Sequence, residues 1–224
     1  MDVYTTLVKF FQEGGLFMYP IAAVLALGLA IALERWLFLT MTTAKNKALW
    51  NAVTPYLKAG NLAGAVQVTS KSGAAIGQVM TYGLNRVRSA RRREDVEQAM
   101  EESLMEVMPR LEKRTHYLAT FANIATLLGL LGTIVGLISA FTAVATANPA
   151  EKADLLSASI SVAMNTTAFG LIVAIPLLLV HTLLQTKTTE IIDSLEMASV
   201  KFLNAITERA TGEPQPAAAA PKQK

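Results

Sequence analysis

The sequence of 224 residues contains no cysteine, which excludes disulfides, thiolate metal sites and cysteine nucleophiles. Charged residues make up only 17% of the chain, against about a quarter in an average soluble domain. Apolar residues reach 52%, so the composition argues against a soluble enzyme and against a disordered chain. The two histidines stand on separate segments, and no phosphate-binding glycine loop or Ser/His/Asp set is present. We therefore expect no cofactor, no metal site and no enzymatic activity.

Long stretches of the chain also lack charge. Residues 14–33, 115–150 and 155–186 contain no Asp, Glu, Lys or Arg. A helix needs about 20 mostly apolar residues to cross the hydrocarbon core of a bilayer, so each window can hold one span. We predict three transmembrane helices, at 16–39, 120–145 and 160–184. The first apolar run is too long for a signal peptide, which favours a retained helix.

The basic residues are unevenly distributed. Thirteen of the 20 Lys and Arg residues lie between Glu34 and Tyr117, five lie from Gln185 onward, and the other two are Lys9 and Lys152. Because basic residues stay on the cytoplasmic side, the N-terminus is predicted to lie outside and the C-terminus in the cytoplasm. The remaining segments are an outer N-terminal segment (1–15), a cytoplasmic helical domain (40–119), an outer loop (146–159), a cytoplasmic helix (185–211) and a disordered tail (212–224).

The middle segment has helical periodicity, with predicted breaks at Thr54-Pro55, Gly60-Asn61 and Ser72-Gly73. From Glu94 to Ala145 we predict one continuous helix with a kink at Pro109. The arginines between 86 and 93 could hold anionic lipid or nucleic acid, but they are interpreted as a solvated helix face. The expected fold is an all-α membrane protein whose long helices extend into the cytoplasm.

The second and third predicted spans carry stripes of small residues at helical spacing. The stripe in the second span comprises Ala125, Gly129, Gly132, Gly136, Ala140 and Ala143. The stripe in the third span comprises Ala163, Thr167, Gly170 and Ala174. Helices in lipid associate where small side chains allow close backbone approach. These residues are predicted to serve helix packing, within one chain or between copies, and Pro176 is predicted to kink the third span.

Polar side chains lie beside these stripes. Counted from the outer loop, Thr133 and Thr167 are roughly 21 and 15 Å deep at 1.5 Å per residue, and Thr166 and Asn165 adjoin the latter. One interpretation is a threonine hydroxyl bonding its own i−4 carbonyl. The other is a hydroxyl-lined ion pathway, which the amide of Asn165 favours because it needs a partner in hydrocarbon.

No predicted span contains a central acid. Glu34 and Arg35 close the first span and are predicted to pair at the interface. Proton relays through membranes normally use a carboxylate or histidine at depth. If this chain moves protons, the titrating group must therefore come from a partner helix.

At these residues the sequence resembles the ExbB/TolQ/MotA family of ion-driven motor channels, especially its three-span ExbB/TolQ branch. The matching motifs are Gly14-Gly15, Met18, Pro20-Ile21 and Glu34-Arg35; Gly129-Leu-Leu-Gly132-Thr133 with Gly136 and Phe141; and Thr167-Ala168, Gly170-Leu171 and Ala174-Ile175-Pro176. The resemblance covers about residues 10–205.

The resemblance implies a pentameric ring of this chain around a dimer of a single-span ExbD/TolR-type partner. It also implies a bacterial inner membrane, with segments 1–15 and 146–159 on the periplasmic side. The partner's transmembrane Asp would carry the ion, and Thr133 and Thr167 would line the pore facing it. Inward ion flow would drive rotation of the dimer and energise TonB-dependent uptake, through a TonB-like protein, or envelope maintenance. One departure stands out, because Val162 occupies a position where the family often has Glu. The oxygen-rich set of Asn165, Thr166 and Thr167 leaves both H⁺ and Na⁺ open as the ion.

The alternative function is a non-conducting membrane scaffold whose cytoplasmic helices dock other proteins. A scaffold would function without the hydroxyls of Thr133 and Thr167, whereas the motor channel needs them. A small-molecule transporter is disfavoured, because no paired repeat or broken helix is visible in the sequence.

Overall fold

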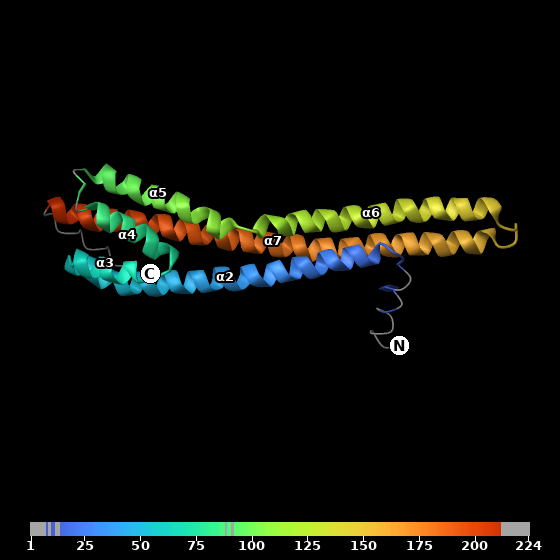
Figure 1. Ribbon diagram of the computed structural model, residues 1–224, viewed down its shortest axis with the longest axis horizontal. Helices are drawn as coiled ribbons and strands as arrows, with labels where there is room; N and C mark the ends of the chain where they lie inside the picture. Colours follow the sequence, from blue (N-terminus) through green and yellow to red (C-terminus); the bar gives the residue numbers. More distant parts are fainter. Residues whose placement is uncertain (1–7, 9, 12–13, 88, 91, 212–224) are drawn as a thin grey trace, which may run out of the picture. The chain divides into compact units, whose positions relative to one another are not determined.

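The computed structural model describes residues 8, 10–11, 14–87, 89–90 and 92–211 of the chain (Figure 1). Its main helices are α2 (Met18–Ala59), α3 (Leu62–Ser70), α4 (Ala75–Val87), α5 (Arg93–Glu112), α6 (Thr115–Thr146) and α7 (Lys152–Thr211). The described residues form no strand, which confirms the all-α class for this part of the chain. The predicted tail, 212–224, and most of the predicted N-terminal segment lie outside the described residues.

The chain divides into two compact units. The first comprises Met1–Leu37 and Lys113–Thr186, and the second comprises Phe38–Glu112 and Lys187–Lys224. Both α2 and α7 contribute to each unit, because each helix continues from its apolar window into a more polar half.

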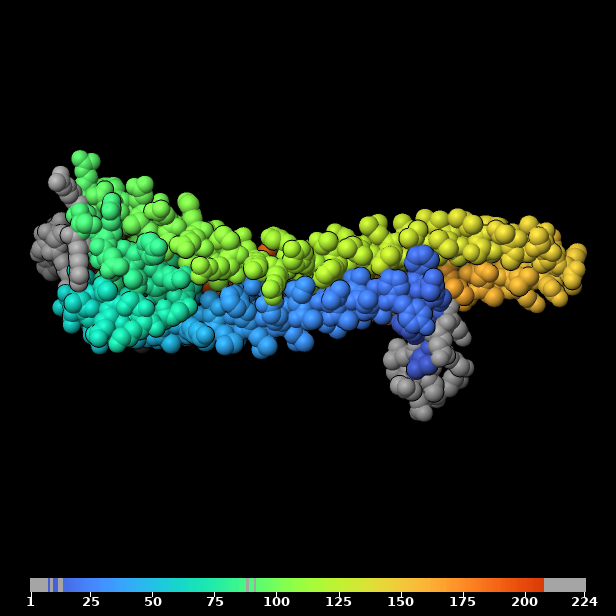
Figure 2. All heavy atoms as spheres, viewed as in Figure 1, coloured from blue at the N-terminus to red at the C-terminus, as the bar shows by residue number. Residues whose placement is uncertain are grey.

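The first unit holds the apolar parts of α2 and α7 together with all of α6. There α6 lies side by side with the first part of α7 (Figure 1), and their atoms touch near the α6–α7 connection (Figure 2). Farther along the pair, Gly136 packs against Ala163 and Gly129 against Gly170. The buried core combines small and large side chains: Met18, Ile21, Ala32, Leu118, Ala122, Ala125, Ala140, Ala163, Val173, Ala174, Leu177 and Leu184. Small residues allow the close approach, and the larger side chains fill the space beside them.

Three helices are long and apolar enough to cross a membrane, as predicted. The candidate spans lie in Met18–Ala59, in Lys152–Thr207 and in Arg93–Thr146, which takes α5 and α6 together across the turn at residues 113–114. Only 22–28% of the most apolar 18-residue stretch of each is buried within the chain. Most of their apolar surface is therefore available to lipid or to other chains.

The second unit packs α3, α4 and α5 with the polar halves of α2 and α7. Its largest buried side chains include Leu39, Met80, Leu84, Met100, Leu111, Leu195 and Phe202. Buried Asn46 joins two helices, because its Oδ1 accepts a hydrogen bond of 3.2 Å from the backbone N–H of Ile76 at the start of α4. Asn61 caps α3 through a 2.8 Å bond from the Gly64 N–H.

One predicted break is wrong, because α2 continues through Pro55 to Ala59. A proline inside a helix removes the N–H that would bond the carbonyl four residues earlier. Here that residue is Asn51, which is exposed, so water can satisfy the carbonyl. The other two breaks are confirmed, since α2 ends before Gly60 and α3 ends at Ser70.

The prediction of one helix from Glu94 to Ala145 is also wrong. The chain passes through Pro109 without leaving α5, and breaks instead between Glu112 and Thr115. Arg114 takes the left-handed conformation, with φ of 68°, which is unfavourable for a residue with a Cβ. Its side chain reaches Glu34 in the first unit, with Nη1 and Oε2 separated by 3.2 Å. This tertiary ion pair accompanies a break that no local sequence signal marks.

The third predicted span lies within α7, which extends from Lys152 to Thr211 as one helix. It therefore begins before the predicted start at residue 160 and includes the predicted cytoplasmic helix. Pro176 is inside α7 and exposed.

Candidate functional site

The α6–α7 seam, defined here by Gly129, Gly132, Thr133 and Gly136 on α6 and by Ala163, Thr166, Thr167 and Gly170 on α7, brings most of the predicted site residues together. The backbones of the two helices approach each other closely at Gly129 and Gly170. A Cβ placed on Gly170 would lie 2.7 Å from the Ala125 carbonyl oxygen and 3.1 Å from the Gly129 Cα. Because these atoms belong to the backbone, neither helix could accommodate a larger residue without moving.

The other small residues follow the same contact. A Cβ on Gly132 would overlap the methyl group of Thr166, and one on Gly136 would lie 3.0 Å from the Cβ of Ala163. Ala174 is buried farther along α7, whereas Pro176 is exposed and lies outside the contact. The seam is therefore a glycine-packed interface within one chain.

Two hydroxyl groups meet inside this interface. Thr133 Oγ1 and Thr167 Oγ1 are hydrogen-bonded to each other across the seam. Both also reach the carbonyl oxygen of Gly129, at 3.2 Å from Thr133 and 3.0 Å from Thr167. Thr133 has a further acceptor in the carbonyl of Ala163 at 3.4 Å. Thr167 thus bonds a carbonyl of the other helix.

The chemistry of this pair follows from counting protons. Each threonine hydroxyl has one proton to donate and two lone pairs to accept with, and here each has more than one acceptor in reach. The two hydroxyls can therefore exchange donor and acceptor roles by rotation. Both residues are half-buried, so a further polar group can approach. A hydroxyl does not ionise near neutral pH, so the pair can relay or orient a hydrogen bond but cannot store a proton.

Thr166 is placed differently from Thr167. Its side chain is buried, and its Oγ1 donates to the carbonyl of Gly14 at 2.6 Å or to its own i−4 carbonyl, Val162, at 2.9 Å. It joins α7 to the residues that precede α2. Asn165 is half-buried and makes no hydrogen bond within the described part of the chain. The four predicted pathway residues therefore have three different environments. Thr133 and Thr167 bond each other, Thr166 bonds the Gly14 carbonyl, and the amide of Asn165 bonds no other described residue.

Val162 lies beside the same link. Its Cγ1 would be 3.1 Å from a Cβ on Gly15, which itself has φ of 74°. An apolar side chain at this position packs against the start of the first span.

Charged and titratable groups gather at the other end of the first unit. Glu34 is bonded to Arg114, and Arg35 is buried with 2% of its surface exposed. The rings of His116 on α6 and His181 on α7 lie 6.4 Å apart. Within the described residues no group of three or more His, Cys, Asp or Glu side chains could hold a metal ion.

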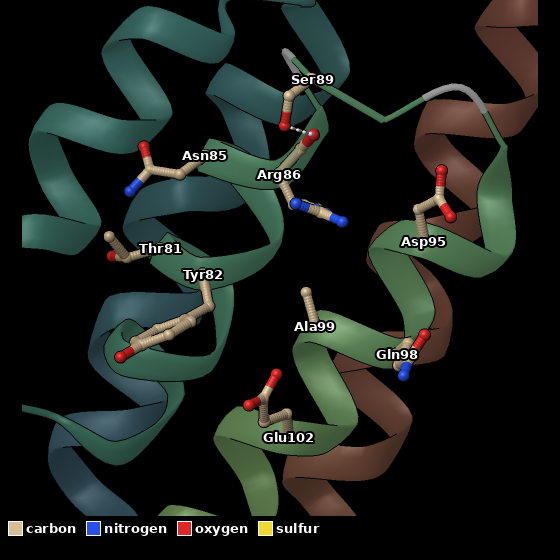
Figure 3. Close-up of a pocket in the computed structure, with 9 residues that line it drawn as sticks. All are labelled: Thr81, Tyr82, Asn85, Arg86, Ser89, Asp95, Gln98, Ala99 and Glu102. Carbon is tan, nitrogen blue, oxygen red and sulfur yellow. Dashed lines mark hydrogen bonds between the residues drawn. The ribbon is translucent and has the colours of Figure 1, made fainter.

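The second unit contains a polar cleft of about 570 Å³ between α4 and α5 (Figure 3). Arg86 extends from α4 toward α5, and Asp95 and Glu102 line the opposite side. The cleft also has the exposed ring of Tyr82 and the amides of Asn85 and Gln98. This mixture of charges suits a polar peptide surface better than an ion path.

Comparison of the sequence with known proteins identifies its family. The sequence profile of the MotA/TolQ/ExbB proton channel family matches residues 71–197, more than half of the chain. The chain belongs to the MotA/TolQ/ExbB proton channel family. The matched range contains the whole α6–α7 seam and the polar cleft.

Two curated relatives agree with this membership of the proton channel family. An ExbB homologue of Methanothermobacter thermautotrophicus, named for biopolymer transport, is 28% identical over 199 residues, which cover 88% of this chain and 69% of the relative. Biopolymer transport protein exbB1 of Vibrio cholerae is 47% identical over 53 residues, which cover 24% of this chain and 23% of the relative. The protein is accordingly a multi-pass membrane protein of a channel and transport family, and that family is not one of enzymes.

Two contacts of the first unit were not predicted from the sequence. The carbonyl of Gly14 accepts the bond from Thr166, but a backbone acceptor has no signature in a sequence. Arg114 pairs with Glu34 across two helices. The only sequence signal for Arg114 was its place in a basic cluster immediately before the second charge-free window, 115–150.

Proposed function

We propose that this chain is the ring-forming subunit of an ion-driven motor channel in a bacterial inner membrane, with its N-terminus periplasmic and its C-terminus cytoplasmic. Five copies surround a dimer of a single-span ExbD/TolR-type partner whose transmembrane Asp carries the ion, and we take this ion to be the proton in the family's description. Inward flow then drives work on periplasmic or outer-membrane machinery, such as TonB-dependent uptake through a TonB-like protein or envelope maintenance.

The Thr133–Thr167 pair carries the proposal. Each threonine is about 20 Å along its helix from the α6–α7 connection, which is mid-membrane depth for helices of this length. The pair supplies hydrogen-bonding groups that do not titrate, and the charge-free windows supply no carboxylate. A partner carboxylate would therefore provide the proton-carrying group that this site lacks, while the hydroxyls orient it and stabilise its ionised form.

The remaining predicted residues have supporting roles in this proposal. Gly129, Gly132, Gly136 and Gly170 hold α6 against α7, so the two hydroxyls stay within bonding distance. Thr166 fixes α7 to the start of the first span, and Asn165 presents a free amide beside the pathway. Glu34 and Arg35 stay at the cytoplasmic end, where Arg114 now completes the charge cluster.

The test replaces Thr133 and Thr167 by valine, separately and together. Valine has nearly the same shape as threonine but no hydroxyl, so the helix contact should persist while the hydrogen bonds are lost. Ion-driven uptake in cells that depend on this chain should fall by about tenfold or more, because a hydrogen bond to an ionised carboxylate contributes about 1.5–3 kcal/mol and about 1.4 kcal/mol corresponds to a factor of ten in rate. Assembly, measured as copy number by native mass spectrometry, should not change.

Thr126→Val is the matched control. It removes a hydroxyl from α6 that bonds only its own i−4 carbonyl, Ala122, at 3.1 Å. Full activity in the control, with loss in the seam variants, supports the proposal. Unchanged activity in the double variant would refute the pathway role. A copy number other than five, or companions without a membrane carboxylate, would refute the proposed assembly.

The alternative function is a non-conducting scaffold, and the polar cleft of Figure 3 favours it as a docking surface. Arg86→Gln with Glu102→Gln would impair a scaffold and leave ion flow intact. The seam variants have the opposite effect if the chain is a motor channel. The two sets of variants therefore discriminate between the functions.

A further inference from the structure

A second cavity, distinct from the α6–α7 seam and from the polar cleft, lies within the second unit. It measures about 250 Å³ and opens between α2, the start of α4 and the end of α5. The residues that line it are Phe38, Met41, Thr42, Lys45, Gly73, Ala74, Ala75, Gln78, Val107, Arg110 and Leu111. Two of them are cations, and none is an acid, which indicates an anionic ligand.

The two cations are not engaged in strong pairs. Arg110 lies 3.9 Å from Glu106, and both side chains are more than half exposed, so this contact contributes little. Lys45 is exposed and makes no ion pair or hydrogen bond within the described residues. Both groups are thus available to bind an anion.

Three backbone N–H groups near the start of α4, those of residues 76–78, are already engaged. The Ile76 N–H already donates to Asn46, and the N–H groups of Gly77 and Gln78 donate to the carbonyl of Ala74. Recognition of an anion therefore falls to the side chains of Lys45 and Arg110.

The opposite part of the lining is apolar. Phe38 and Met41 are 39% and 55% exposed, and Val107 and Leu111 are buried beneath the cavity. Phe38 and Met41 stand at the end of the predicted first span, and Lys45 is six residues beyond Leu39, about 9 Å along the helix. A headgroup layer is roughly 5–7 Å thick on each side of the hydrocarbon, and a lysine side chain can extend several Å toward it.

We propose that this cavity binds the headgroup of an anionic phospholipid of the cytoplasmic leaflet. Lys45 and Arg110 contact the phosphate, and Phe38 and Met41 pack against the glycerol and the first carbons of the acyl chains. Basic pockets beside membrane spans on this side are suited to such headgroups. The inference rests on the topology of the proposed function but concerns a different site.

The test measures phospholipid retention by native mass spectrometry on the full chain in its assembled form. Protein is titrated with phosphatidylglycerol or phosphatidylcholine of equal acyl length. Wild type should bind phosphatidylglycerol, and Lys45→Gln with Arg110→Gln should weaken that binding about thirtyfold, as expected for two lost phosphate contacts. Binding of phosphatidylcholine, which has no net charge, should be weaker in wild type and change less in the variant.

The control is Lys58→Gln with Lys201→Gln, which removes the same charge from the second unit outside this cavity. An equal loss in both double variants would mean general electrostatic attraction and would overturn the site. Displacement of the lipid signal by millimolar inorganic phosphate alone would assign the cations to a soluble anion and would also overturn it. Unchanged phosphatidylglycerol binding by the Lys45→Gln, Arg110→Gln variant would overturn the site as well. This result is expected if a second copy of the chain covers the cavity.

Topology is measured separately, so the two proposals fail in distinguishable ways. The absence of native cysteine makes Lys47→Cys a single-cysteine reporter. Labelling of this position from the cytoplasmic side supports the placement. Labelling from the periplasmic side would refute both the topology and the leaflet, whereas loss of lipid selectivity alone would leave the motor proposal unaffected.

Discussion

Gly170→Ala is the sharpest probe of the α6–α7 seam. The new methyl group would lie 2.7 Å from the Ala125 carbonyl oxygen, 3.1 Å from the Gly129 Cα and 3.4 Å from the Gly129 nitrogen. All three are backbone atoms of α6, so no side chain can rotate away. The helices must separate by several tenths of an ångström at the point where they are closest.

The expected change in stability combines three effects. Forcing an extra carbon into a packed interface costs about 1–3 kcal/mol. Separation also lengthens the bond from Thr167 Oγ1 to the Gly129 carbonyl, now 3.0 Å, and such a bond contributes about 0.6 kcal/mol in a membrane protein. Alanine returns about 1 kcal/mol through its higher helix propensity. The net destabilisation is about 0.5–2.5 kcal/mol.

Gly28→Ala is a matched control in the same unit. Its new Cβ would lie 2.7 Å from Leu177 Cδ2 and 3.0 Å from Cδ1, which are the far ends of a flexible side chain. The leucine can change rotamer, so the cost should be smaller or absent. Both variants are compared with wild type by thermal unfolding in one detergent, where about 2 kcal/mol corresponds to a Tm shift of roughly 4–8 °C. A Gly170→Ala protein as stable as the Gly28→Ala protein would refute the close-packed seam.

Two further variants test local features of the fold. Arg114→Gly should be more stable than Arg114→Ala by about 1 kcal/mol in denaturant unfolding. Both variants lose the half-exposed ion pair with Glu34, but only glycine adopts the positive φ without strain. Equal stabilities of the two variants would show that the left-handed turn is not maintained. Asn61→Ala should cost about 1 kcal/mol and accelerate hydrogen exchange at the Gly64 amide, because the side chain caps α3 through that N–H. Unchanged hydrogen exchange at the Gly64 amide would show that the Asn61 side chain does not cap α3.

The membrane character of the chain was readable from the sequence, because a charge in hydrocarbon is costly and its absence over 20 or more residues is conspicuous. The three candidate spans follow from windows 14–33, 115–150 and 155–186. Family membership was equally accessible, since it rests on short motifs in a fixed order. The turn signals at Gly60-Asn61 and Ser72-Gly73 were reliable for a local reason, which is that glycine and asparagine favour turn conformations.

Helical periodicity also placed the small residues of each span on one face, but it could not say what that face touches. A repeat of 3.6 residues fixes which side chains share a side of one helix and leaves the partner and the rotation open. Thr166 and Thr167 are adjacent in sequence, yet one bonds Gly14 and the other Thr133 and Gly129. Which threonine joins the seam is decided by how α7 is rotated against its neighbours.

The sequence by itself determined the class of the protein, its apolar spans and the residue types of its site, because these depend on composition and on distances along one chain. Only the tertiary structure decided that α5 and α6 separate at Arg114 and that Glu34 pairs with Arg114. It likewise decided that the hydroxyls of Thr133 and Thr167 meet between two glycine faces. These features need atoms from two helices, and their geometry is set by close packing, which local preferences along the chain do not encode.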